Sequence, residues 1–269
     1  MGLNIVVLAK QVPDTRNVGK DAMKEDGTVN RAALPAIFNP EDKNALEQAL
    51  RLKDKEEGST VRVLTMGPAR AAEIIRESMY RGADGGALLS GREFAGADTL
   101  ATSYALSCAI KKFGKVDIIV CGRQAIDGDT AQVGPQIAQH LGLPQVSYVE
   151  NIEAVNERSI VLRRQFEDRY HIVEAQLPCL ITVLSELNKP RYMSVSGVFD
   201  AYREKKVAKI TLADLEDVID KSNIGLGGSP TRVKQSFTKQ PKGKGEKFET
   251  DADDAVRIIV EKLAEKHLI

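Results

Sequence analysis

The sequence predicts an α/β fold with an open, mostly parallel sheet covered by helices on both faces. Short apolar segments rich in β-branched residues alternate with segments of helical periodicity through the first half of the chain. Parallel strands joined by helical crossovers give this pattern. One strand leads into an acidic loop with glycines before its helix, and such loops lie at the edge of the sheet where ligands bind.

Four strands are expected, and the first, residues 4–9, is nearly all apolar, as in a strand that is buried on both faces of a sheet. The four strands cover residues 4–9, 60–65, 87–90 and 118–121. The helices that follow them are expected at residues 40–57, 69–81, 98–112 and 131–141. Asn39 is placed as the cap of the first of these helices, and Pro40 at its first position. Asp26-Gly27 predicts a hairpin turn before that helix.

Right-handed crossovers bring the loops after parallel strands to one edge of the sheet. We therefore expect Lys10, Met66 and the loop at residues 122–130 to converge, although they are far apart in the sequence. Lys10 either faces a ligand there or is a solvated strand end.

The loop after the fourth strand is the main candidate site. Residues 127–130, Asp-Gly-Asp-Thr, precede a helix, and amide groups at a helix start attract anions, above all phosphate. Either Asp129 or Thr130 is suited to capping that helix. Gly128 and Gly134 let a ligand or a second backbone approach closely. The pattern predicts either a nucleotide-phosphate site or a plain turn, and it contains neither GxGxxG nor GxxxxGK[ST].

The second half of the chain has a different pattern. Residues 159–165 and 170–175 alternate and predict paired strands, and residues 180–184 predict a last short strand. Helical signals then become scarce, so we place the end of the compact core near Leu184. The expected domains are residues 1–184, a nucleotide-binding α/β domain, and residues 185–269, an arm with a terminal helix.

Two features of the arm favour a partner chain. Residues 225–250 are rich in Gly, Pro and Lys, so they are expected to be disordered or laid over a partner. Residues 251–268 are amphipathic, with Thr250 or Asp251 as the cap. Such a helix docks either on its own chain or, as we prefer, on a partner.

Composition argues against several classes of protein. Lysines and arginines number 38 and acidic residues 38, so no net charge favours nucleic acid. No apolar segment approaches the ~20 residues of a membrane helix, and we expect no membrane insertion and a cytoplasmic protein. The three cysteines and three histidines lack metal-site spacing, and Cys121 is expected to be a buried small hydrophobe. No nucleophile with a matched base is evident, so if the protein takes part in catalysis a cofactor must carry the chemistry.

Three stretches, in order along the chain, resemble the beta subunit of electron transfer flavoproteins. They are VLAKQVPD at residues 7–14 with Asn39-Pro40, GRQAID at residues 122–127 with Asp129, Gln132 and Gly134, and NKPRY at residues 188–192. The resemblance covers residues 3 to about 212 and continues more loosely to the end. It implies an open, Rossmann-like α/β domain that binds an adenine nucleotide, and an arm that wraps the alpha subunit.

The resemblance also implies a nucleotide site. Asp127 and Asp129 would orient ribose or loop amides, and Thr130, Gln132 and Val133 would hold phosphate. The implied cofactor-binding set is Leu8, Asn39, Asp42, Met66, Gly122, Ile126, Asp127, Gly128, Asp129, Thr130, Ala131, Gln132, Val133, Gly134 and Pro135.

Other residues are carried over with different roles. Arg123 either stabilises a reduced, anionic flavin or forms a surface salt bridge. Arg191, Tyr192 and Val195 fall in the family segment that docks on dehydrogenases, with Val195 at the apolar anchor position. Asp200 stands where dehydrogenase-docking relatives usually have a basic residue, which leaves the identity of the partner open.

Members of this family divide by the nucleotide that the beta subunit holds. Chains with structural AMP tend to have three consecutive acids in the loop, whereas Gly128 takes the middle position here. A missing carboxylate relieves repulsion and opens space for a pyrophosphate. The resemblance thus implies an FAD that takes a hydride from NADH. Its electrons would go to ferredoxin or flavodoxin and, through the alpha-subunit FAD, to an FAD-containing dehydrogenase. The alternatives are a carrier with AMP and a free-standing nucleotide-binding or nucleotide-sensing module.

Overall fold

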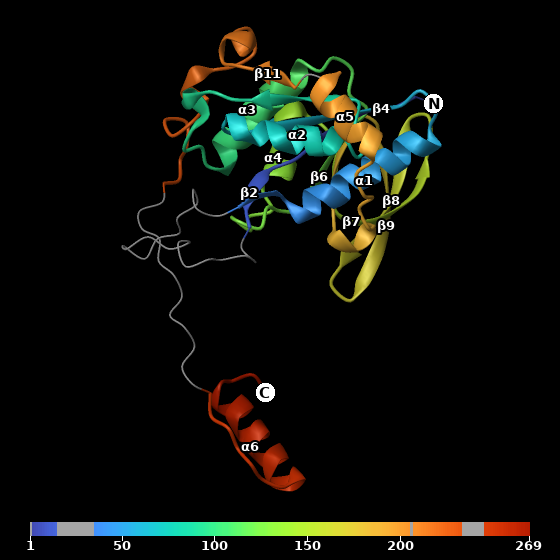
Figure 1. Cartoon of the computed structure of the whole chain (residues 1–269). Helices are drawn as coiled ribbons and strands as arrows, with labels where there is room; N and C mark the ends of the chain where they lie inside the picture. The colour runs from blue at the N-terminus through green and yellow to red at the C-terminus, as the bar shows by residue number, and fades with distance from the viewer. Residues whose placement is uncertain (1, 15–34, 205–206, 233–244) are drawn as a thin grey trace.

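The computed structural model describes residues 2–14, 35–204, 207–232 and 245–269. One sheet contains β1 (Asn4–Leu8), β4 (Thr60–Met66), β5 (Gly85–Leu89), β6 (Ile118–Gly122), β7 (Gln145–Val155), β8 (Ser159–Phe166), β9 (Arg169–Gln176), β10 (Cys179–Val183) and β11 (Ala208–Ile210). Its strand order is β11-β5-β4-β1-β6-β10-β7-β8-β9, and Figure 1 shows β8 and β9 at one end of the molecule. Every neighbouring pair from β11 to β7 is parallel, while β8 and β9 add antiparallel strands at one edge. The expected fold class is confirmed.

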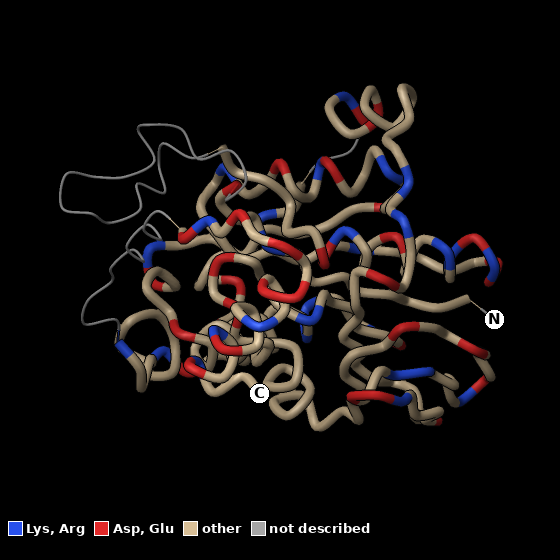
Figure 2. Tube along the Cα trace, turned by 90° about the horizontal axis from the view of Figure 1, so that it is seen from below, with Lys and Arg blue, Asp and Glu red and all other residues tan. Residues whose placement is uncertain are grey.

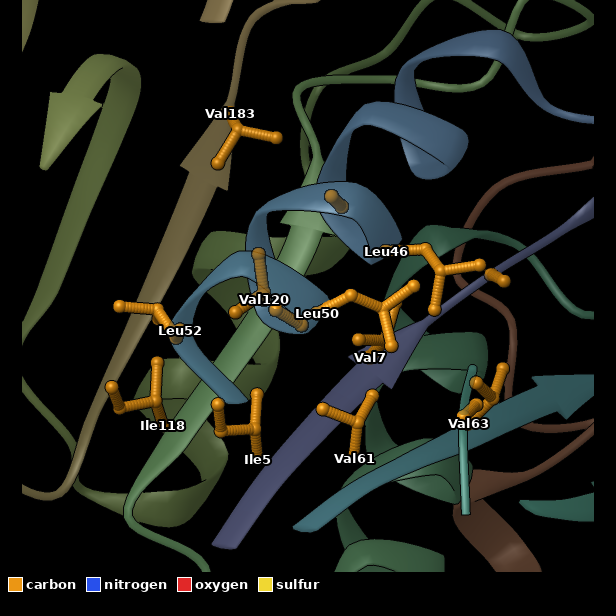
Figure 3. Packing of buried hydrophobic residues seen from close by; sticks show 14 of the residues in the cluster. Ile5, Val7, Leu46, Leu50, Leu52, Val61, Val63, Ile118, Val120 and Val183 are labelled. Carbon is orange, nitrogen blue, oxygen red and sulfur yellow. The ribbon is translucent and has the colours of Figure 1, made fainter. Parts of the chain in front are cut away.

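Helices cover both faces of this sheet. On one face lie α1 (Pro40–Lys55), α2 (Ala72–Met79) and α5 (Val195–Arg203), and on the other α3 (Thr99–Lys111) and α4 (Val133–Leu141). The alternation of the strands divides the core accordingly: Ile5 and Val7 pack with α1, whereas Val6 packs with α3. Figure 3 shows Leu46 and Leu50 of α1 on the same side of the sheet as Ile5 and Val7. Full burial of one such side chain contributes ~1.5–3 kcal/mol to the stability of the folded protein.

A two-stranded ribbon joins the first strand to the first helix. It pairs β2 (Gln11–Pro13) with β3 (Ala36–Phe38) and brings the chain to the start of α1. The expected Asp26-Gly27 turn lies outside the described residues.

The long strand β7 was not expected from the sequence. Its register shifts against β8 and again against β10, and Tyr148 has a positive φ of 61°. Such irregularities break the two-residue alternation of apolar and polar side chains by which a strand is identified in a sequence. The sequence of β7 therefore does not look like a strand, although its Val146 and Val149 are buried.

The compact body extends beyond the boundary expected near Leu184. The unexpected helix α5 packs on α2, β11 pairs with β5, and Leu215 and Ile224 are buried in the core. Residues 225–232 continue along the body, where Ser229 is buried and accepts a hydrogen bond from Asp98 N–H (2.8 Å). This part of the arm therefore packs on its own chain, and residues 233–244 are outside the described residues.

The terminal helix α6 (Ala252–Glu265) begins as expected. Asp251 caps it by accepting a hydrogen bond from Asp254 N–H (2.9 Å). None of its residues is buried, and Figure 1 shows it apart from the body. Figure 2 shows lysines and arginines interspersed with acidic residues along the trace.

Candidate functional site

A cavity of about 580 Å³ opens at the carboxyl-terminal edge of the parallel strands. Leu8, Met66 and Gly122, at the ends of β1, β4 and β6, line it together with Lys10 and the segment 128–134. The loops after these strands therefore converge as the topology predicted, and Lys10 lies beside the cavity.

The loop after β6 is fixed to the first turn of α1. The Glu41 carboxylate accepts hydrogen bonds from the Arg123 guanidinium (2.7 Å) and the Gln124 N–H (3.0 Å). Asn39 accepts from the Ile126 N–H (3.1 Å) and donates to the Gln124 carbonyl (2.9 Å). Asn39 occupies the N-cap position but makes no side-chain capping bond. Its expected capping role was wrong, because the loop takes up its amide group.

Asp42 is a buried carboxyl that joins two strand ends. It accepts hydrogen bonds from the Lys10 N–H (2.9 Å) and the Gly122 N–H (3.0 Å). Burial raises the pKa of Asp42 to about 7, although these amide bonds and the Asn39 side chain act to lower it. A Cβ on Gly122 would lie 2.7 Å from the Asp42 carboxylate, so glycine permits this close approach.

The two loop aspartates are bonded within the chain. Asp127 forms an ion pair with Lys10 Nζ (2.7 Å), and Asp129 accepts a hydrogen bond from Gln124 Nε2 (3.0 Å). These contacts stabilise the loop across the mouth of the cavity. No group of three or more potential metal ligands occurs among the residues that the structure describes.

The loop carries backbone strain where it faces the cavity. Asp129 and Ala131 have positive φ values of 50° and 52°, and each such non-glycine residue costs ~1–3 kcal/mol. Left-handed residues in a loop also turn amide groups outward, as in anion-binding nests.

Helix α4 begins without a side-chain cap. Its N-cap is Gln132, whose side chain accepts a hydrogen bond from Thr99 Oγ1 (2.9 Å) on the opposite wall. Neither Asp129 nor Thr130 caps the helix, contrary to expectation, because the left-handed bend at Ala131 separates them from its first turn. The first-turn amide groups lack intrahelical partners, and Gln132 and Val133 line the cavity.

The two loop glycines have different roles. A Cβ on Gly128 would meet nothing within 4 Å, so this position borders open space. A Cβ on Gly134 would lie 2.9 Å from both Cys121 Sγ and Thr182 Cγ2, so Gly134 permits α4 to pack closely on the sheet. Cys121 is buried and free, as expected.

Arg123 lines the cavity and forms the salt bridge with Glu41 that was one of its two expected roles. Its Nε is buried and has no hydrogen-bond partner.

The structure brings together most of the predicted site residues. Those that line the cavity are Leu8, Asp42, Met66, Gly122, Gly128, Asp129, Thr130, Ala131, Gln132, Val133 and Gly134. Four predicted site residues lie outside the lining: Asn39, Ile126, Asp127 and Pro135. Two of these bond to lining residues, Asn39 to Gln124 and Asp127 to Lys10.

One wall of the cavity was missed. It consists of Phe94, Thr99, Thr102 and Leu106, from the start of α3 and the turn before it. The available sequence signal was Asp98, at which a helix was expected to begin. Asp98 caps α3 by accepting a hydrogen bond from Ala101 N–H (3.0 Å) and so marks a second helix start at this edge.

The expected docking residues lie elsewhere on the surface. Tyr192 and Val195 are 86% and 77% exposed, whereas Arg191 is bonded to Glu47 and Asp54 of α1. None of the helices in the described ranges is long and apolar enough to cross a membrane.

Comparison with known proteins identifies the family. The electron transfer flavoprotein domain matches residues 26–215. The chain is 51% identical over 267 residues to the electron transfer flavoprotein subunit beta of Clostridium acetobutylicum. It is 50% identical over 269 residues to the caffeyl-CoA reductase-Etf complex subunit CarD of Acetobacterium woodii, and 47% over 272 residues to the acryloyl-CoA reductase electron transfer subunit gamma of Anaerotignum propionicum. Each match covers 99% of this chain and 100% of the relative. The chain therefore belongs to the electron transfer flavoprotein family, among its beta subunits.

Proposed function

We propose that this beta subunit pairs with an alpha subunit and holds FAD in the cavity at the strand ends. The observation that carries the proposal is the uncapped start of α4, which borders that cavity beside a loop with two left-handed residues. Free amide groups at a helix start bind nucleotide phosphates. The cavity of about 580 Å³ falls within the ~300–1,000 Å³ that is usual for ligand sites.

The residues present fit a dinucleotide. Thr130, Gln132 and Val133 would hold its phosphates through side-chain or amide groups. The open space at Gly128 leaves room for a pyrophosphate and adds no third carboxylate. Lys10 neutralises the carboxylate of Asp127, which reduces repulsion of an anionic ligand.

FAD bound there would supply the acceptance of a hydride from NADH and the delivery of single electrons. The chain itself binds and orients the cofactor. The Arg123 guanidinium, held by Glu41 at the cavity wall, would stabilise negative charge on the reduced flavin. We propose that the electrons divide between low-potential ferredoxin or flavodoxin and a high-potential acceptor, reached through the alpha-subunit FAD and a dehydrogenase.

Two exposed apolar surfaces are the proposed docking sites for partner proteins. Val256, Ile259 and Val260 of α6 are exposed on a helix with no buried residue, and we propose that this helix docks on the alpha subunit. Tyr192 and Val195 would dock an FAD-containing dehydrogenase. Two relatives are named as parts of CoA reductase systems, which supports a partner of that class. We place the complex in the cytoplasm, where its free cysteines would stay reduced.

Cofactor content tests this proposal. The two subunits are co-expressed, and FAD and AMP are extracted and counted for each purified heterodimer. Two FAD for each heterodimer are expected. One FAD with one AMP would refute FAD in this chain and establish the AMP-holding carrier. A stable monomer that does not associate with the alpha subunit would overturn the heterodimer and favour a nucleotide-sensing module.

A further inference from the structure

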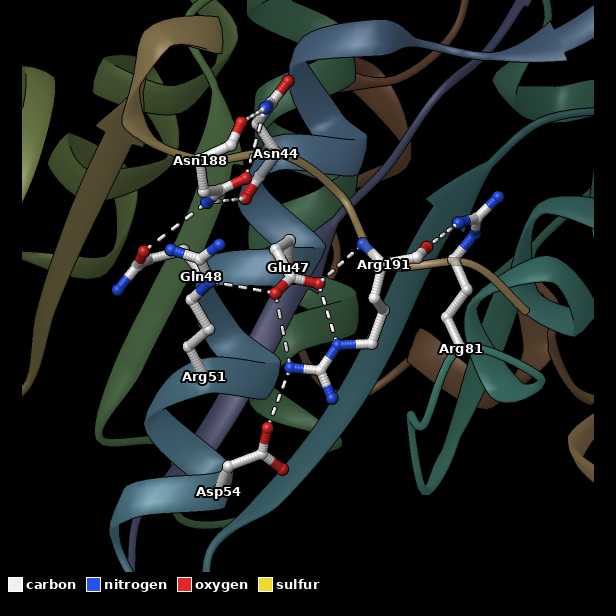
Figure 4. A network of polar contacts seen from close by, with 8 residues as sticks. All are labelled: Asn44, Glu47, Gln48, Arg51, Asp54, Arg81, Asn188 and Arg191. Atoms are coloured by element: carbon white, nitrogen blue, oxygen red, sulfur yellow. Dashed lines mark hydrogen bonds and ion pairs between the residues drawn. The ribbon is translucent and has the colours of Figure 1, made fainter. Parts of the chain in front are cut away.

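The chain after β10 is tied to one side of α1. Asn44 Nδ2 donates hydrogen bonds to the carbonyl groups of Ser185 (3.0 Å) and Asn188 (2.7 Å). Asn188 Nδ2 donates in return to the Asn44 carbonyl (3.0 Å). Figure 4 shows the contacts between Asn44 and Asn188 one turn before Glu47 on the same helix.

Glu47 continues this attachment with a buried carboxylate. It accepts hydrogen bonds from Arg191 Nε (2.8 Å) and Arg191 N–H (3.0 Å), and its other oxygen accepts from Arg51 Nε (2.9 Å). Only 4% of Glu47 is exposed. Burial acts to raise the pKa of Glu47, but the Arg191 and Arg51 bonds outweigh it and lower that pKa below its ordinary value. The group is therefore ionised near neutral pH, and charge-assisted bonds of this kind are strong.

The end of α2 holds the same segment from the other side. Arg81 donates a hydrogen bond to the Arg191 carbonyl, and the Ser194 N–H donates to the Tyr80 carbonyl (3.0 Å). A Cβ on Gly197 would lie 2.7 Å from the Tyr80 oxygen. The backbone of residues 188–197 is thus fixed by two helices.

Several side chains on and just after this fixed backbone project into solvent. Tyr192, Met193, Val195 and Phe199 are all large, apolar and exposed. An apolar surface on ordered backbone binds a partner without a further cost of ordering. When only a fraction of the molecules has the ordered conformation, the apparent affinity for the partner is lowered by that fraction.

We propose that Glu47 is a positioning residue for electron transfer: its carboxylate holds residues 188–194 so that residues 192–199 are presented to the partner dehydrogenase. This inference rests on the dehydrogenase docking in the proposed function. Glu47 itself is buried and acts through Arg191.

The test uses the complete heterodimer with Glu47→Gln. Amide hydrogen exchange is measured on peptides that cover residues 188–199. Electron transfer is measured from NADH, with ferredoxin present as the low-potential acceptor, to an acyl-CoA dehydrogenase that passes its electrons to an enoyl-CoA. It is measured separately from NADH to a tetrazolium dye. We expect faster exchange at residues 188–199 and a KM for the dehydrogenase raised about tenfold. The kcat, the dye activity and the flavin content should stay within about twofold of wild type, because the cavity is unchanged.

Two further variants make the test specific. Asp54→Asn removes an exposed contact to the same guanidinium and should change KM by less than about twofold, since exposed pairs contribute little. Arg191→Lys keeps the charge but loses the two-pronged contact, so it should reproduce the Glu47→Gln effects.

Three outcomes overturn the inference. Unchanged exchange in Glu47→Gln means that Glu47 does not hold the segment. Faster exchange with an unchanged KM means that order in this segment does not matter for docking. A wild-type heterodimer with two FAD that reduces the dye but not the dehydrogenase removes the docking on which the inference rests, while FAD binding in the proposed function stands.

Discussion

Replacement of Asp42 by Asn should change the pH dependence of stability in a defined direction. Asp42 has an ordinary pKa of 3.8 and, in the folded protein, a pKa of about 7 because it is buried. Between these values the folded protein binds a proton that the unfolded chain has released. The contribution of Asp42 to the free energy of unfolding is therefore complete in acid and is lost as the pH rises through 7.

The size of the effect follows from the two pKa values. Their difference, 7 minus 3.8 or 3.2 units, corresponds to about 4 kcal/mol in total at 1.36 kcal/mol for each unit. About 2–3 kcal/mol of this is lost between pH 5 and pH 8. Asn does not titrate. The loss in free energy of unfolding caused by Asp42→Asn should therefore be smaller at pH 8 than at pH 5 by this amount, about 2–3 kcal/mol.

Urea unfolding of wild type and Asp42→Asn at pH 5 and pH 8 measures this difference. Asp117→Asn is the matched control. Burial acts to raise the pKa of Asp117, but hydrogen bonds from Asn4 lower it overall. Asp117 is thus ionised in both states throughout this range, and the cost of its substitution should not depend on pH. An equal cost of Asp42→Asn at both pH values would refute the reasoning.

Three other predictions concern the loop, the packing beneath it and the arm. Gly128→Asp should fit sterically and weaken FAD binding about tenfold more than Gly128→Ala, because it adds a carboxylate worth ~1–2 kcal/mol of repulsion; equal flavin occupancy in the two variants would count against this. Gly134→Ala should destabilise the protein by ~1–3 kcal/mol in urea unfolding, since its Cβ would overlap Cys121 and Thr182. Deletion of residues 251–269 should prevent heterodimer formation in size-exclusion chromatography while the melting temperature of the isolated chain changes by less than about 2 °C, because α6 buries nothing.

Local signals predicted much of the fold. A helix was expected to begin at Asp98, and α3 does; Asp251 caps α6 as expected, because a side-chain cap involves only residues that are neighbours in the sequence. The parallel core was predictable from its apolar strands, and its topology alone brings Lys10 and Met66 to one cavity.

The residues that were misjudged act over long distances in the chain. Asn39 was expected to cap α1, but it bonds a loop more than 80 residues away. The start of α3 was not identified as a cavity wall, since nothing in its sequence indicates which loop it faces. The strand β7 was not predicted because its register shifts disturb the alternation of buried and exposed residues.

The polar side of α1 connects the two proposed sites. In the sequence, Glu41, Asp42, Asn44 and Glu47 resemble a solvated helix face, yet the structure buries all four. The first two hold the cavity loop, and the last two hold the docking segment. Buried polar groups require partners, so each pair fixes one loop to the same rigid helix. If the two attachments are independent, Asp42→Asn should leave amide exchange at residues 188–199 unchanged, and Glu47→Gln should leave nucleotide affinity unchanged. Reciprocal changes in both measurements would instead show that α1 couples nucleotide binding to partner docking.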